Sequence, residues 1–410
     1  MSQADPARQC AWRVLEACER QPDSFAEQWL RRYCQRLSPR DAALARELSL
    51  GALRLGLLYD AVMARLLQRP DPAPALRRAL RLALHQMLSM DRIPAHAIGA
   101  STGSLLRWSG SQRLVAVANA VIRRVIDRLE PGEEPLQRLP KDLWPRDPGL
   151  RYGLPPSFVE HVRGGGLEIT IDDAQLAACS RCPPLATRAL SGAVIDDHPA
   201  ILRQEGIWTW WSDPHAALAG PVAAGKAVVQ DPAQVKALEL AGPLEGRLVL
   251  DCCAAPGGKS RYLREQGAQV VAADMSRERL ARMQSAVHGH LLCADARAQA
   301  LAPGFALVVA DVPCSNSGVW GRRPEARYRY HANALRSLRQ LQGSILRAAA
   351  QLVAEDGKLL YTTCSLSPGE NQEQVRALQG WQIEREQLTW PSQWHAGGYA
   401  CLLSRMSRTG

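Results

Sequence analysis

The first 130 residues carry apolar side chains at a helical spacing. Apolar positions recur three and four apart, which places them on one face of an α-helix. Ser38 directly precedes Pro39, a pair typical of an N-cap followed by proline at the first helical position. The segments with this pattern are residues 10–18, 25–37, 42–67, 76–90 and 114–129. We therefore expect an all-α domain over residues 1–135.

From about residue 236 to the end at 410, short apolar runs alternate with helical patterns. Such alternation predicts a mostly parallel, doubly wound, Rossmann-like α/β sheet. Ligands of these sheets bind at the carboxyl ends of the strands. The expected strands are residues 248–252, 270–274, 291–294, 305–310 and 358–362, and the expected helices are 259–266, 277–287 and 334–353.

The stretch between these two parts has a mixed pattern. Prolines punctuate residues 136–150 and predict a linker. Residues 151–235 show short strand patterns at 185–190, 194–196 and 206–211, which indicate a small α+β middle module. Its tryptophans Trp208, Trp210 and Trp211 are interpreted as core residues. The chain is thus predicted to be multidomain.

Composition narrows the class of protein. No run of about 18 apolar residues and no secretory signal occur among the 410 residues, so we expect a cytoplasmic protein without a membrane partner. The formal net charge of +10 favours a polyanion such as RNA, although arginine-rich composition alone would also produce it. Arg77, Arg78 and Arg81 belong to a polar helix face, either solvated or in contact with RNA.

The eleven cysteines do not form a disulfide framework. Cys179 and Cys182 make a CxxC motif, but no second ligand pair follows at a suitable spacing, so we predict no metal site. Cys252, Cys253 and Cys293 are interpreted as packing residues.

A glycine-containing turn follows the first expected strand of the α/β part. The sequence from Asp251 to Ser260 matches neither a dinucleotide fingerprint nor a complete P-loop. Asp274 ends the next strand, where an acid commonly holds ribose hydroxyls, and Asp295 ends the third, within reach of an adenine amino group. Helix capping is the alternative for each acid alone. The ordered set favours S-adenosylmethionine as cofactor.

Two cysteines stand just after expected strands. Cys314 lies in Asp311-Val312-Pro313-Cys314, and Cys364 in Thr362-Thr363-Cys364-Ser365. A thiolate that adds to carbon 6 of a pyrimidine activates carbon 5 towards a methyl donor, which is covalent catalysis. Spacing alone does not say which cysteine attacks.

Three motifs in order carry a resemblance to a known family. Residues 251–260, 311–315 and 363–371 resemble the RNA 5-methylcytosine methyltransferases, and residues 92–98 with 117–123 resemble the NusB-like RNA-binding domain. Together they resemble the RsmB group. The resemblance implies methyl transfer from S-adenosylmethionine to carbon 5 of a cytosine in 16S ribosomal RNA.

The resemblance also implies roles for single residues. Cys364 would be the nucleophile, Cys314 the product-releasing cysteine, and Asp311 a contact to base and cofactor. The implied cofactor residues are Cys253, Ala254, Ala255, Pro256, Gly257, Gly258, Lys259, Asp274, Asp295 and Asp311.

The chain departs from the family pattern at Val312, Gly321 and Asp356, which removes no catalytic group but leaves the RNA target open. Two alternatives therefore stand beside a 16S substrate: a tRNA or other ribosomal RNA site, and a non-catalytic RNA-binding assembly factor. We expect no DNA partner and a monomer.

A basic and aromatic stretch follows the Cys314 motif. A base must leave its stack to reach a buried site, and nearby cations and aromatic rings would help to hold the RNA. We predict RNA contacts there; the alternative is that the stretch is the solvent-exposed start of a helix. The candidates are Arg322, Arg323, Arg327 and Arg329.

Overall fold

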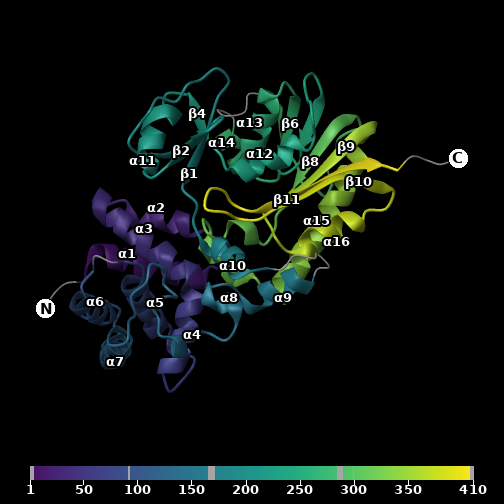
Figure 1. Cartoon of the computed structure of the whole chain (residues 1–410). Helices are drawn as coiled ribbons and strands as arrows, with labels where there is room; N and C mark the ends of the chain where they lie inside the picture. Colours follow the sequence, from purple (N-terminus) through teal and green to yellow (C-terminus); the bar gives the residue numbers. More distant parts are fainter. Residues whose placement is uncertain (1–3, 91–92, 165–170, 284–289, 299, 407–410) are drawn as a thin grey trace. The chain divides into compact units, whose positions relative to one another are not determined.

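The computed structural model describes residues 4–90, 93–164, 171–283, 290–298 and 300–406. These residues form two compact units (Figure 1). The first unit runs from the N-terminus to Arg163 and also takes in 171–180 and Trp320–His331. The second unit contains Arg181–Val319 and the chain from Ala332 onward.

The first unit is helical, as predicted. The helical segment expected over 42–67 is divided at Leu55, where the backbone leaves the helical conformation. The Ser38 hydroxyl accepts a hydrogen bond from the backbone N–H of Asp41 at 3.1 Å, with Pro39 at the first position, which confirms the predicted cap. The helices are α1 Pro6–Arg20, α2 Ala26–Cys34, α3 Pro39–Arg54, α4 Gly56–Leu66, α5 Pro74–Ser89, α6 Ala95–Trp108, α7 Val115–Ile126, α8 Pro148–Arg151, α9 Pro156–Gly164 and α10 Asp173–Ser180.

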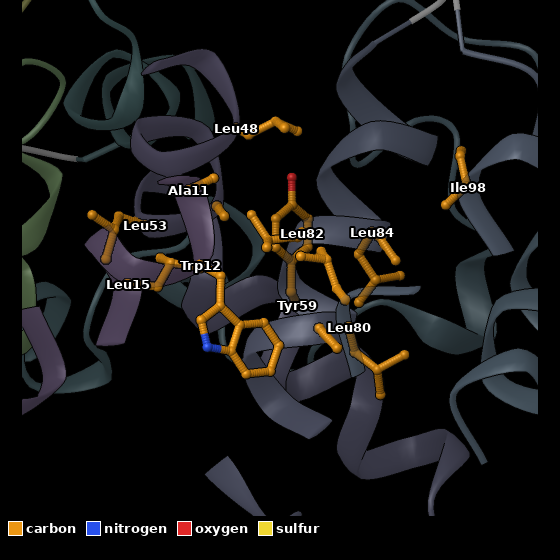
Figure 2. Packing of buried hydrophobic residues seen from close by; sticks show 14 of the residues in the cluster. Ala11, Trp12, Leu15, Leu48, Leu53, Tyr59, Leu80, Leu82, Leu84 and Ile98 are labelled. Atoms are coloured by element: carbon orange, nitrogen blue, oxygen red, sulfur yellow. The ribbon is translucent and has the colours of Figure 1, made fainter. Parts of the chain in front are cut away.

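Large apolar side chains from several helices fill the centre of this unit. Figure 2 shows Trp12 and Leu15 of α1 beside Tyr59 of α4 and Leu80 of α5, all buried. Leu139 and Leu143 belong to the same core. The stretch 136–150, expected to be a linker, therefore contributes to the packing of the helical unit.

Two of the arginines expected on a polar face are buried instead. Arg78 is paired with Glu16 and Glu19 of α1, and Arg81 is paired with Asp60 of α4. A buried guanidinium is tolerated when carboxylates satisfy its charge and its donors. Neither alternative for these two arginines was correct, because they neither face solvent nor present a surface to RNA.

The second unit is built on a seven-stranded sheet. Five strands, β5 to β9, run parallel at the predicted places, which confirms the Rossmann-like prediction. Two C-terminal strands that we did not predict extend it: β11 pairs antiparallel with β9, and β10 pairs antiparallel with β11. The spatial order is β10 Trp381–Thr389, β11 Gly398–Arg405, β9 Val353–Thr363, β8 Phe305–Asp311, β5 Leu248–Asp251, β6 Gln269–Asp274 and β7 His290–Cys293.

Helices connect the parallel strands. The helix expected over 277–287 is described to Met283, and its remaining residues lie outside the described chain. The apolar residues of α15 pack on the sheet, and Ile345, Leu346 and Ala349 belong to the same core as Val308 of β8. The connecting helices are α13 Gly258–Glu265, α14 Arg277–Met283 and α15 Ala332–Leu352, whereas α11 Pro214–Ala217 and α12 Pro232–Glu239 precede β5 and α16 Gln372–Arg376 follows β9.

A smaller antiparallel sheet precedes the large one in the second unit. Trp210 and Trp211 are buried in it, as predicted. The strand expected at 194–196 is absent, since these residues form an irregular loop. The strand order is β2 Ile201–Glu205, β3 Trp208–Trp211, β1 Leu185–Ala189 and β4 Ala227–Val229. A helix that is long and apolar enough to cross a membrane does not occur in the described parts of the chain.

Candidate active site

The two strand-end cysteines lie against each other. Strands β8 and β9 are parallel neighbours with Asp311 opposite Thr362, so the segments that leave their carboxyl ends meet. The Sγ atoms of Cys314 and Cys364 are 3.1 Å apart, and neither cysteine is in a disulfide. The hydrogen bond with Cys364 and burial raise the pKa of Cys314 well above its usual value. The Cys364 thiol also contacts the Asn316 side-chain oxygen at 3.3 Å.

Asp311 and Lys259 form an ion pair at the same end of the sheet. The Lys259 ammonium lies 2.6 Å from Oδ2 of Asp311, and the Thr362 hydroxyl donates to Oδ1 at 2.8 Å. Burial alone would lower the pKa of Lys259, but the Asp311 carboxylate raises it above the usual value. The carboxyl ends of β8 and β9 therefore carry a cation fixed by Asp311 as well as the two thiols.

The predicted cofactor loop joins β5 to α13. Gly257 has φ 102°, a left-handed conformation that favours glycine, and it places the backbone at the start of α13. Below the loop, Asp251 is fully buried and accepts a hydrogen bond from the Ser260 hydroxyl at 2.6 Å. Burial raises the pKa of Asp251 to about 6. The Ala255–Pro256 peptide bond is cis.

The two predicted acids follow on the next strands. Asp274 ends β6 and is buried; it accepts the backbone N–H of Ala255 at 3.2 Å and pairs with Arg279 at 2.8 Å. Asp295 follows β7, and hydrogen bonds from Arg297 lower its pKa to about 2. A glycine turn and two acids at three neighbouring strand ends fit a nucleoside ligand that carries a sulfonium group.

The cysteines of these strands differ in exposure. Cys252 is buried and its thiol contacts the carbonyl oxygen of Val309 at 3.1 Å, in agreement with a packing role. Cys293 is exposed, so the packing interpretation was wrong for it. Cys179 is buried and Cys182 exposed, and no cluster of possible metal ligands occurs in the described part of the chain.

Sequence reasoning assigned no role to Glu370, although it lies in the third motif. Its carboxylate is fully buried and accepts hydrogen bonds from Ser315 and Ser365, the residues that directly follow the two cysteines. The only signal for Glu370 in the sequence is its position in the motif. Its contacts join two segments that are 50 residues apart, so they could not be derived from a local pattern.

One arginine of the basic stretch after Cys314 does not have the predicted role of an RNA contact. Arg327 is buried in the helical unit, where its guanidinium donates to the carbonyl oxygens of Arg54, Gly153 and Trp320. Burial lowers its pKa to about 10. Because these donors are already used inside the protein, Arg327 is a structural residue and not an RNA contact. Arg323 is exposed, with its guanidinium 4.7 Å from the centre of the Phe25 ring.

Comparison with known proteins identifies the family. The profile of the 16S rRNA methyltransferase RsmB/F family matches residues 238–395, and that of the NusB family matches residues 5–127. Ribosomal RNA small subunit methyltransferase B of Vibrio cholerae is 31% identical over 84% of this chain and 82% of its own length. The chain belongs to the RsmB/F methyltransferase family. The enzyme of the same name from Pseudomonas putida is 32% identical over 83% of this chain and 82% of its own length.

Solved structures agree with this fold. The crystal structure of PH0851 superposes with a TM-score of 0.73 over 99% of this chain and all of that one, at 20% identity. A methyltransferase homologue from Pyrococcus horikoshii has a TM-score of 0.51 and covers 63% of this chain and 98% of its own. Membership of the RsmB/F family confirms the predicted NusB-like domain and the prediction of an S-adenosylmethionine-dependent methyltransferase.

Proposed function

We propose that this chain methylates carbon 5 of a cytosine in 16S ribosomal RNA through a covalent adduct with Cys364. The observation that carries the proposal is the contact of the two thiols, 3.1 Å apart, beside the Asp311–Lys259 ion pair. A methyltransferase that acts on a nucleophilic oxygen or nitrogen needs no such pair of cysteines. Carbon 5 of cytosine needs an attacking cysteine, because it is a poor nucleophile until a thiolate has added to carbon 6, and the second cysteine would release the product.

The cofactor would be held by the loop Cys253–Lys259 together with Asp274 and Asp295. Asp274 lies at the end of β6, where an acid commonly binds ribose hydroxyls, and Asp295 would reach the base. When bound, S-adenosylmethionine supplies the methyl group and leaves as S-adenosylhomocysteine.

The residues of the chain then divide the reaction into two easier steps. The Cys364 thiolate forms a bond to carbon 6, and the displaced electron pair moves towards ring nitrogen 3, where the Lys259–Asp311 pair supplies a proton or a hydrogen bond through Asp311. Carbon 5, now enamine-like, takes the methyl group. Its proton passes to Cys314 in the thiolate form, the bond between sulfur and carbon 6 breaks, and the aromatic ring and Asp311 return to their starting states.

The RNA partner would be recognised by positive charge and by the helical domain. The net charge of +10 supports a polyanionic substrate. Arg322, Arg323 and Arg329 stay proposed RNA contacts. We propose that the chain works as a monomer, and a ribosomal RNA substrate would place its activity in the cytoplasm.

The test is transfer of a labelled methyl group to 16S ribosomal RNA that lacks the modification. We expect transfer by the wild-type chain, none by Cys364→Ala, and a trapped protein–RNA adduct with Cys314→Ala. The matched control is Cys182→Ala, which changes an exposed thiol and is expected to be fully active.

Three results would overturn parts of the proposal. Transfer to tRNA and not to 16S ribosomal RNA would keep the chemistry and replace the substrate. A trapped adduct in Cys364→Ala would exchange the two cysteine roles. Cofactor binding without transfer to any RNA would favour the non-catalytic assembly factor.

A further inference from the structure

Glu370 connects the two segments that carry the cysteines. Its Oε1 atom accepts hydrogen bonds from the backbone N–H of Ser315 at 2.8 Å and from Nε2 of Gln342 at 3.0 Å. Its Oε2 atom accepts from the hydroxyls of Ser315 at 2.5 Å and Ser365 at 2.6 Å. One carboxylate therefore binds the residue next to Cys314 and the residue next to Cys364.

The groups around Glu370 hold its carboxylate in a fixed position. Glu370 is 0% exposed, and all four of these donors are neutral. Its own carbonyl oxygen accepts the Tyr361 hydroxyl at 2.7 Å, which fixes the backbone against β9. The neighbouring Asn371 accepts the Thr363 hydroxyl at 2.6 Å and donates to the carbonyl oxygen of Ser365 at 2.9 Å. A buried carboxylate with this many fixed donors has little freedom to move.

We infer that Glu370 is a positioning residue for the reaction: it holds the two thiols in contact and places a negative charge close to Cys314. The inference rests on the proposed function for the meaning of the two thiols. A negative charge disfavours a second one close by. Glu370 is among the groups that raise the pKa of Cys314, after the hydrogen bond with Cys364 and burial.

A positive charge at the same strand ends acts in the other direction. Cys364 is among the groups that raise the pKa of Lys259, so the ammonium lies within electrostatic reach of that cysteine. Glu370 and Lys259 therefore act on the thiol pair in opposite directions. The ionisable groups that face the thiol pair are Glu370, Asp311, Lys259 and Tyr361, and the Arg339–Glu373 ion pair lies beside Gly369.

The experiment uses the full-length protein and three variants. Glu370→Gln keeps the shape and removes the charge, and Ser315→Ala combined with Ser365→Ala removes the two hydroxyl hydrogen bonds and keeps the charge. Glu373→Gln is the matched control, because Glu373 is an exposed glutamate three residues away. Two quantities are measured: single-turnover methylation with its RNA dependence, and the pH profile of iodoacetamide alkylation at each cysteine, read by mass spectrometry.

We expect Glu370→Gln to slow the chemical step roughly 10- to 100-fold, the usual effect of misplacing a reacting group, with little change in KM for RNA. It should also shift the alkylation profile of Cys314 to lower pH by about one unit. The serine double variant should slow the chemical step without that shift. Glu373→Gln should change neither quantity.

An unchanged rate in the serine variant would remove the positioning role, even if Glu370→Gln fails to fold. An unchanged alkylation profile in folded Glu370→Gln would remove the electrostatic role. If the wild-type chain methylates no RNA, the proposed function fails, whereas the alkylation profiles still decide the effect of the Glu370 charge.

Discussion

Replacing Asp251 with asparagine should stabilise the protein near neutral pH. Asp251 is fully buried at the end of β5, and burial raises its pKa from the usual 3.8 to about 6. A raised carboxyl pKa means that the folded state holds the proton more tightly than the unfolded state. The stabilising contribution of the protonated Asp251 carboxyl group is complete below pH 3.8. It is lost as the pH rises through the folded pKa of about 6.

The size of the effect follows from the two pKa values. A difference of about two units corresponds to about 3 kcal/mol at 1.36 kcal/mol per unit. Asparagine is isosteric, can still accept the Ser260 hydrogen bond, and carries no charge to desolvate. The free energy of unfolding of the asparagine variant should exceed that of wild type by about 1.6 kcal/mol at pH 5 and by about 3 kcal/mol at pH 7, and the difference should stay constant above pH 7.

The assay is urea unfolding of the cofactor-free chain between pH 5 and 8. The transition of the second unit is followed by hydrogen exchange of peptides from β5 and β6. Asp295→Asn is the matched control, because hydrogen bonds from Arg297 lower the pKa of Asp295, so its removal should not stabilise. A variant Asp251→Asn that is less stable than wild type at pH 7, or whose advantage is the same at pH 5 and 8, would refute the reasoning.

Three further changes test other parts of the structure. Lys259→Met leaves the Asp311 carboxylate without its cation and should lower methyl transfer roughly 100-fold in the labelled-methyl assay, while circular dichroism stays unchanged. Arg327→Met deprives three buried carbonyl oxygens of their donor and should destabilise the helical unit by about 2–3 kcal/mol, measured by urea unfolding. Ser38→Ala removes the cap of α3 and should cost about 1 kcal/mol in the same assay; no change in either unfolding experiment would contradict the assigned contacts.

Local sequence patterns were sufficient for most of the secondary structure. The five parallel strands and the capped helix α3 follow from apolar runs, spacing and turn residues, all of which act within a few positions. Strands β10 and β11 were not predicted. The exposed face of β10 carries mostly polar residues, and β11 is specified by its pairing with β9, 40 residues earlier. Pairing at that distance leaves no periodic signal.

The residues of the candidate site were predicted, but not how they interact. Motifs placed Asp311, Cys314 and Cys364 at strand ends, and parallel topology brings such ends together. The hydrogen bonds of Glu370 could not be derived in this way, because each depends on side-chain direction in two separate segments. The same limit applies to the Lys259–Asp311 ion pair, whose partners are 52 residues apart.

The stretch Trp320–His331 shows why charge alone did not identify an RNA contact. Arginine usually marks a solvated or nucleic-acid-binding surface because its burial is costly. Arg327 overcomes this cost because Arg54 and Gly153 supply carbonyl oxygens within the helical unit and Trp320 supplies another close in sequence. That helical unit is therefore completed by a segment that begins only six residues after Cys314. The chain enters it between Val319 and Trp320 and leaves it after His331, so no single cut in the sequence separates the helical unit from the unit that carries the thiols.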